Sequence, residues 1–172
     1  MDVTVDLKGF AELAQELKNL PEKIGKNVLR SAVGAGAAVI RVEAKKNAQA
    51  IKDTGTLARS IYQKQIRELS GPEKQTFYVG ARQGKAHQKV GKKGLSRDAF
   101  YARFVELGHF SRPSTGVRIG RSALIDHLKA GTVHWVPARP FLRPAFEVGK
   151  TRAVDAMGAK IAERLQTIKA KP

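Results

Sequence analysis

The sequence predicts an α+β fold in which a small antiparallel sheet packs against one long central helix and a C-terminal helix. Three observations carry this prediction. Residues 21–50 and residues 144–168 each repeat apolar side chains every three or four positions, as amphipathic helices do. Between them, residues 60–69 and 75–81 are rich in Ile, Tyr, Phe, Val and Thr and flank a Gly-Pro-Glu turn, which is typical of an antiparallel hairpin. A length of 172 residues suits a single domain over residues 1–172.

The N-terminal part predicts a short strand followed by a short helix. Residues 2–7 alternate apolar and polar side chains, which is a strand pattern. From Gly9 to Pro21 the apolar residues instead recur at helical spacing, and proline ends that helix.

Pro21 can begin the long central helix, residues 21–50. We expect its apolar stripe to consist of Ile24, Val28, Ala32, Ala35, Val39 and Val42. Residues 31–38 are unusually small and include two glycines, each of which costs about 1 kcal/mol in a helix relative to alanine. Close approach of another backbone would offset that cost. We expect an intramolecular contact here, and a subunit interface is the alternative.

The segment from Asp53 to Ile61 predicts a capped turn and a single helical turn that leads into the hairpin. Residues 100–107 carry five large apolar side chains and fit either a strand or a helix. Within them, we expect Glu106 to face a neighbouring arginine.

Two excursions leave the core. Residues 82–97 predict a flexible basic loop, because cations alternate with glycines and too little apolar surface is present to order the segment. Residues 109–134 form a polar insertion with a short helix predicted over residues 121–129. The loop cations that we expect to face a polyanion are Lys85, Lys89, Lys92, Lys93 and Arg97.

Three prolines fix the backbone of a rigid segment before the last helix, and Pro144 suits the first turn of that helix. We expect this segment to be an assembly anchor, with Phe146 in the chain's own core and Phe141 against a neighbouring subunit. The predicted anchor residues are Pro137, Arg139, Pro140, Phe141, Leu142, Arg143, Pro144 and Phe146.

The charge indicates a polyanionic partner. Lys and Arg number 32 against 15 Asp and Glu, a net charge of +17. Cations on a flexible loop can neutralise phosphates without reading bases, although such a loop can also serve solubility alone. Residues 1–17 carry four acids and one lysine, a net charge of −3, which leaves +20 for the rest. In a ring, this acidic part would lie against a basic face of the next subunit.

No metal, cofactor or catalytic site is predicted. The glycine- and lysine-rich stretch of residues 80–94 lacks the spacing of a phosphate-binding loop, and the acids are spread singly rather than grouped as a metal-dependent nuclease requires. The absence of cysteine excludes disulfides and thiolate zinc sites. No pair of histidines has the i, i+4 spacing of a helical zinc motif; the four are His87, His109, His127 and His134.

Membrane insertion and secretion are not expected either. The N-terminus lacks the basic start and apolar run of a signal peptide. The longest small-apolar stretch, residues 32–40, is about half the length that a membrane span needs. We therefore expect a soluble intracellular product.

Three segments, in this order, resemble the tail-completion or head-tail joining family of long-tailed bacteriophages: residues 53–61, residues 101–108 and residues 137–146. Further matches lie in residues 3–9, 20–24, 44–45 and 77–80. The chain departs from the family pattern at Ile51, where proline is common, and at His109, where threonine often follows the glycine.

The resemblance implies a virion protein of the neck or tail top rather than an enzyme. It implies a homo-oligomeric ring, sixfold to match the tail tube, with the phage DNA passing through it. Partners would include the tail terminator and the head-closure protein, and assembly would take place in the host cytoplasm. Two other classes remain as alternatives: a host protein that binds nucleic acid without sequence specificity, and a nuclease.

Overall fold

The computed structural model describes residues 10–18, 22–51, 55–83, 89–90, 95–96, 99–111 and 121–170. The strand predicted at residues 2–7 lies outside these residues, as do the loop cations Lys85, Lys92, Lys93 and Arg97. In chain order the elements are α1 (Phe10–Lys18), α2 (Glu22–Ala50), α3 (Thr56–Ser60), β1 (Ile61–Gln65), the 3-10 turn η1 (Arg67–Leu69), β2 (Phe77–Ala81), β3 (Lys89–Val90), β4 (Leu95–Ser96), α4 (Ala102–Leu107), β5 (His109–Phe110), α5 (Arg121–Lys129), β6 (Trp135–Val136) and α6 (Leu142–Lys169).

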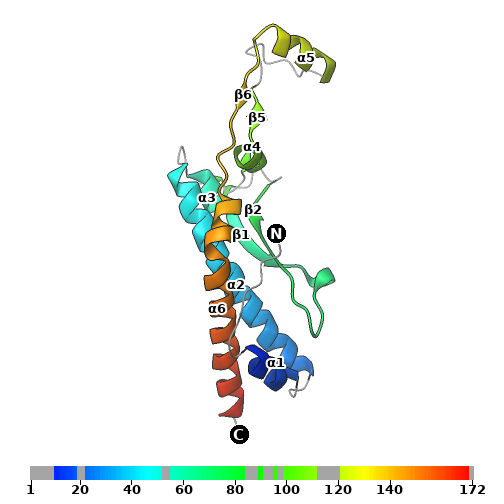
Figure 1. Cartoon of the computed structure of the whole chain (residues 1–172), viewed down its shortest axis with the longest axis vertical. Helices are drawn as coiled ribbons and strands as arrows, with labels where there is room; N and C mark the ends of the chain where they lie inside the picture. The colour runs from blue at the N-terminus through cyan, green and yellow to red at the C-terminus, as the bar shows by residue number, and fades with distance from the viewer. Residues whose placement is uncertain are drawn as a thin grey trace.

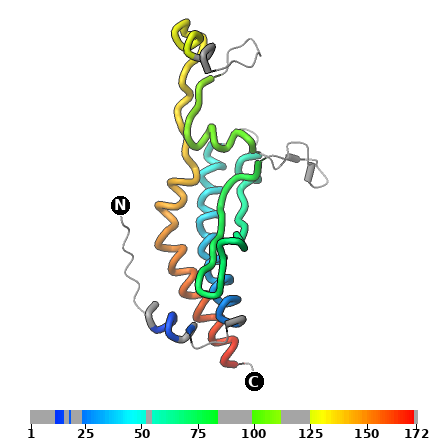
Figure 2. The backbone as a smooth tube through the Cα atoms, turned by 90° about the vertical axis from the view of Figure 1, so that its right-hand side faces the viewer, coloured from blue at the N-terminus to red at the C-terminus, as the bar shows by residue number. Residues whose placement is uncertain are grey.

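The α+β prediction is confirmed. The two long helices, α2 and α6, run antiparallel and side by side along the body (Figure 1). The β1–β2 hairpin covers α2 on the side away from α6, so α2 is the middle layer (Figure 2). None of the described helices is long and apolar enough to cross a membrane.

The small residues of α2 allow the close helix packing that the sequence predicts. A Cβ atom added to Gly36 would lie 3.0 Å from the carbonyl oxygen of Ala153 and would collide with the Met157 side chain. A Cβ atom on Gly149 would lie 2.8 Å from the Cδ1 atom of Ile40. On the sheet side, Gly34 faces the ring of Phe77. The small stretch therefore serves an intramolecular contact with both α6 and the sheet.

The predicted apolar stripe of α2 is wrong in its second half. Most of the buried positions lie four or eight residues apart, through Val28, Ala32, Gly36, Ala44 and Ala48, with Gly25 and Ala37 beside this row, whereas Val42 is 59% exposed. Helix α6 packs along one row of α2 residues that are four positions apart. This row diverges from the stripe that a mixed spacing of three and four predicts, so the end of the predicted stripe is exposed.

Two clusters make up the core. The lower cluster joins Val28 and Ala32 of α2 to Ile161 and Leu165 of α6, with Leu13 of α1 against them. The upper cluster consists mainly of alanines from several elements around one large side chain, Phe141. Small residues let several backbones approach one point, and the phenyl ring fills the space that remains.

The hairpin is also confirmed. Strands β1 and β2 are antiparallel, with Ile61 opposite Ala81 and Gln65 opposite Phe77. Its strands are shorter than predicted, because residues 67–69 turn into η1. The inner face is fixed to α2 by the Gln63 side chain, whose Nε2 donates to the Gly34 carbonyl oxygen at 3.1 Å.

The two excursions differ from each other. Residues 100–107, which fit either a strand or a helix, form α4. Beyond α4, the insertion is an arm in which β5 pairs with β6 and carries α5, as predicted for residues 121–129 (Figure 1). Within the predicted basic loop, β3 and β4 form a short antiparallel pair, and Lys89 lies in β3.

Candidate assembly site

The carboxylate of Glu106 caps the start of α6. Its Oε2 atom accepts hydrogen bonds from the backbone N–H groups of Phe141 at 2.8 Å and Leu142 at 3.0 Å, and its Oε1 atom accepts one from Arg143 at 3.0 Å. The first N–H groups of a helix have no partner within it, and negative charge is favourable at that end. Glu106 therefore holds a backbone terminus of its own chain, and the expected arginine partner is wrong.

The anchor segment is held from two further directions. The Asn47 side chain of α2 donates to the carbonyl oxygen of Phe141 at 3.2 Å, and the backbone N–H of Arg139 donates to the carbonyl oxygen of Val105 at 2.8 Å. The anchor is thus fixed to α2 and to α4 before α6 begins.

Neither anchor phenylalanine lies where the sequence predicts. Phe141 is 0% exposed and fills the upper cluster, whereas Phe146 is 55% exposed. The reason is helical geometry. Ala145 points into the core, and the next position on a helix is rotated by about 100° around the axis. Phe146 therefore leaves the surface that α6 buries.

The three segments that resemble the phage family meet at this point. The first supplies Leu57, Ala58 and Ile61, the second supplies Ala102, and the third supplies Phe141 and Ala145 to the same cluster. We call this cluster, together with Glu106, the junction. Its contacts are internal, so the most recognisable parts of the sequence build the chain's own architecture.

The remaining anchor residues are more open. Leu142 and Pro144 are half-buried, and Pro144 lies in the first turn of α6 as predicted. The exposed ones are Pro137, Arg139, Pro140, Arg143 and Phe146. They remain available for contacts outside the chain.

An exposed apolar surface lies where the arm joins the body of the molecule. The rings of Phe110 and Trp135 meet edge to face with centroids 5.0 Å apart, and the Phe104 ring lies 5.5 Å from that of His109. Gly108, at a φ of 76°, allows the Trp135 ring to approach the backbone. Phe104, Phe110 and Trp135 are all about half exposed, and Trp135 is 52% exposed. We call these four aromatic side chains the arm-base surface.

Such a concentration of exposed rings is typical of an interaction site. The sequence prediction missed it, because Phe110 and Trp135 are separated by a polar insertion and become neighbours only when β5 pairs with β6. Their position at the two ends of that insertion is the signal that could have revealed it.

The histidines of the arm stabilise it locally. The Nδ1 atom of His127 lies 2.8 Å from the hydroxyl of Thr132, and the Nδ1 atom of His134 lies 3.1 Å from the hydroxyl of Ser111. Among the described residues, no group of three His, Cys, Asp or Glu side chains could hold a metal ion.

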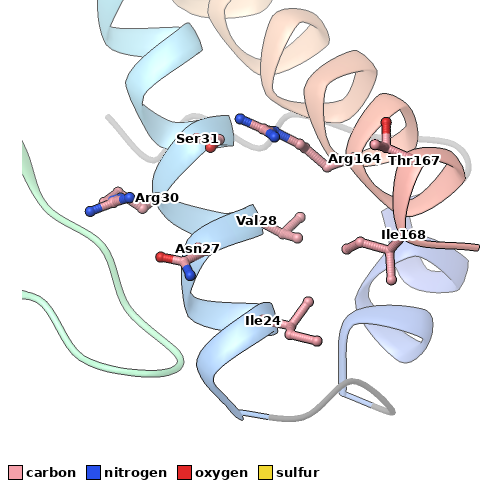
Figure 3. A pocket seen from close by; sticks show the side chains of 8 residues that line it. All are labelled: Ile24, Asn27, Val28, Arg30, Ser31, Arg164, Thr167 and Ile168. Carbon is pink, nitrogen blue, oxygen red and sulfur yellow. The ribbon is translucent and has the colours of Figure 1, made fainter. Parts of the chain in front are cut away.

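A groove opens between the start of α2 and the end of α6, with a volume of about 340 Å³ (Figure 3). Ile24, Val28 and Ile168 form its apolar part, and the Arg164 side chain extends across it toward Ser31. No carboxylate is among the lining residues that the structure describes, which also include Asn27, Arg30 and Thr167. The groove combines an apolar floor with positive charge.

Further along α2 and α6, toward the arm, the positive charge of α6 is paired with a carboxylate. The carboxylate of Glu43 on α2 is 2.9 Å from the Arg152 guanidinium on α6 and 3.7 Å from the Lys46 ammonium. The hydrogen bond from Arg152 is the main cause that lowers the pKa of Glu43, with a smaller contribution from Lys46. Among the described residues, the groove is therefore lined by cations without a carboxylate, whereas Arg152 is paired with Glu43.

A family model described as "Bacteriophage HK97-gp10, putative tail-component" matches residues 11–108. The match includes α1, α2, α3, the β1–β2 hairpin and α4, and it ends where the arm begins. No curated protein and no solved structure matches the chain. The match covers more than half of the chain, and it contains two of the three segments that meet at the junction. The chain therefore belongs to the HK97-gp10-like family of bacteriophage tail components.

Proposed function

We propose that this protein is a structural subunit of the phage neck or tail top, which completes the tail by forming a ring around the DNA channel that leads to the head. Membership of a phage tail-component family is the observation that carries this proposal. The proposed role is structural and not enzymatic. The ring would be sixfold, to match the tail tube, and would contact the tail terminator and the head-closure protein. It would be assembled in the host cytoplasm and retained in the virion.

Ring closure requires a heterologous contact, in which two different surfaces of one chain meet. The structure offers two candidates: the arm-base surface near one end of the long helices and the groove near the other. The segment that follows β6 connects the arm-base surface to the exposed anchor residues, such as Arg143 and Phe146.

The groove suits the acidic N-terminal part of a neighbouring subunit. Residues 2–7 alternate Val3, Val5 and Leu7 with Asp2, Thr4 and Asp6. Apolar side chains on one side of such a segment would meet the groove floor, and carboxylates on the other would meet Arg164. A chain with a net charge of +17 repels its own copies, and this contact would offset part of that repulsion.

The loop cations Lys85, Lys89, Lys92, Lys93 and Arg97 would approach the DNA in the channel. Contacts of this kind neutralise phosphates and carry no sequence preference.

Electron microscopy of the virion with a tag on this protein tests the main proposal. We expect the tag in a ring of six subunits at the top of the tail. A tag found along the tail tube, or absent from the virion, would show that the proposed function is wrong.

Charge reversal tests the subunit contact. Asp6→Lys alone and Arg164→Glu alone should each weaken assembly, and an equal mixture of the two variants should restore it, because alternating subunits then present complementary pairs. A contact within one chain would leave the mixture as defective as either variant. Lys26→Glu, an exposed cation of α2 outside the groove lining, is the control. Native mass spectrometry of the assembled species gives the readout.

The net charge of +17 favours one other function, that of a free nucleic-acid-binding protein of the host. That function predicts that the protein is absent from purified virions and binds duplex DNA as a monomer. Detection of the protein in the virion neck would exclude this alternative.

A further inference from the structure

The outer face of the β1–β2 sheet carries a set of aromatic and cationic side chains that the proposed function has not used. Side chains alternate between the two faces of a strand. Gln63 points inward and bonds to α2, and Phe77 packs on Gly34 of the same helix. The alternate positions therefore face outward. They are Tyr62 and Lys64 of β1, Tyr78 of β2, and Arg82, which directly follows β2. We call these four the outer sheet face.

Tyr78 is positioned by a glycine. Gly80 lies opposite Tyr62 in the strand register, and a Cβ atom on Gly80 would collide with the Tyr78 ring. The Tyr78 ring consequently lies across Gly80, with its centroid 5.9 Å from that of Tyr62. The arrangement is specific, since any larger residue at position 80 would displace this ring.

Both the backbone and the side chain of Arg82 are held in place. Its backbone N–H donates to the carbonyl oxygen of Ser60 at 3.0 Å, and its carbonyl oxygen accepts from Ala99 at 2.9 Å. Its guanidinium carbon lies 5.3 Å from the centroid of the Tyr62 ring. A guanidinium stacked on an aromatic ring keeps its N–H donors at the edge, where they can form paired hydrogen bonds with an anion.

The charges on this face are uncompensated in the part of the chain that the structure describes. Neither Lys64 nor Arg82 forms an ion pair with a described side chain, and both are exposed. The acids of the same hairpin, Glu68 and Glu73, lie at its turn, in and after η1, at the end away from Arg82. Tyr78 is 45% exposed, so part of its side chain remains accessible.

We propose that the outer sheet face is a phosphate-binding site for the backbone of duplex DNA. Arg82, held on Tyr62, donates to one phosphate, Lys64 pairs with a second, and the tyrosine hydroxyls donate to the same strand. The basic loop begins at Arg82, so in the sequence the outer sheet face is followed directly by this cation-rich segment. This inference rests on the proposed function, since it identifies which folded surface the channel DNA would touch.

Binding of a short duplex of random sequence to the purified full-length protein tests the site. The logarithm of the binding constant should fall linearly with the logarithm of the salt concentration, and each lost phosphate contact should reduce the slope by about 0.9. Arg82→Gln and Lys64→Gln should each remove one such contact. Lys129→Gln changes an exposed cation of α5 in the arm, away from the sheet, and should leave the slope unchanged.

Tyr62→Leu separates positioning from simple charge. It keeps both cations but removes the ring under Arg82, so it should weaken duplex binding severalfold with the slope closer to wild type than in Arg82→Gln. Thermal unfolding of each variant shows whether it has remained folded. Arg82→Gln retains the backbone bonds that fix its position.

Two results would overturn the site: wild-type slopes in both Arg82→Gln and Lys64→Gln, or no duplex binding by the wild type at low salt. Tighter binding to a single-stranded oligonucleotide than to the duplex would also overturn it, because it would indicate base stacking on the tyrosines. These results leave the neck assignment standing. The tag location in the virion tests that assignment separately.

Discussion

The junction and the outer sheet face both combine aromatic and charged side chains, but they use them in opposite ways. At the junction the Glu106 carboxylate is saturated by three backbone donors, and Phe141 is fully buried. On the sheet, Arg82 rests on Tyr62 with its charge exposed to solvent. The comparison teaches that the three segments with a resemblance to the phage family maintain the shape of the subunit. The surfaces able to contact other molecules come from residues that are unremarkable in the sequence.

The largest expected effect separates two phenylalanines of the same anchor. Phe141→Ala should lower the free energy of unfolding by about 3–5 kcal/mol, because it leaves a cavity in the upper cluster. Phe146→Ala, the matched control, should cost less than about 1 kcal/mol, because its side chain is largely exposed. Urea denaturation measures both. Equal losses would break the distinction between the buried junction and the open surface.

The next effect concerns the helix cap. Glu106→Ala should destabilise the protein by about 1–3 kcal/mol, since three backbone donors at the start of α6 lose their acceptor. Glu147→Ala, on the exposed side of the same helix, removes only an ion pair with Lys150 and should cost less than about 1 kcal/mol. Denaturant midpoints of the two variants provide the comparison. If Glu106→Ala left the denaturant midpoint unchanged, the start of α6 would not depend on this cap.

Two glycines sharpen the contrast between interior and surface. Gly36→Ala places a methyl group against the Ala153 backbone and should cost about 1–2 kcal/mol, even after the gain in helix propensity. Gly80→Ala should cost less than about 1 kcal/mol, because the half-exposed Tyr78 ring can swing away. It should nevertheless weaken duplex binding, since Tyr78 loses its position. If Gly80→Ala lowered the stability more than Gly36→Ala, the tighter packing would lie on the sheet and not between the helices.

The smallest effect is the surface ion pair between α2 and α6. Arg152 lowers the pKa of Glu43, so this carboxylate stabilises the folded state above its ordinary pKa of 4.5 and loses that contribution as the pH falls through its lowered value. Glu43→Gln should therefore be slightly less stable than wild type at neutral pH, and the difference should vanish in acid. Unfolding curves at several pH values measure this. A difference that grows in acid would contradict the sign of the shift.

Local patterns predicted most of the fold. The spacing of apolar residues gave α2 to within a residue of its bounds, and the composition around residues 71–73 predicted the hairpin. Residues 121–129 formed the expected helix. These predictions succeeded because periodicity and turn residues act over a few positions, and the structure retains those local preferences.

The site was predicted less well, because its contacts are distant in the sequence. Nothing near Glu106 indicates that it caps a helix starting at residue 142, and the orientation of Phe141 follows from that cap. Whether Tyr62 and Tyr78 meet depends on the exact strand register, which a hairpin pattern does not specify. The DNA-facing role of the loop cations stays a prediction.

The arm has a consequence for how such subunits can be altered. Its two strands leave the body side by side, as the pairing of His109 with Val136 shows, and the backbone N–H of Ser111 bonds to the carbonyl oxygen of His134. A segment whose ends are held together in this way can be shortened, exchanged or replaced by a foreign module without moving α4 or α6. The arm is therefore the natural place to graft a new specificity onto this tail component.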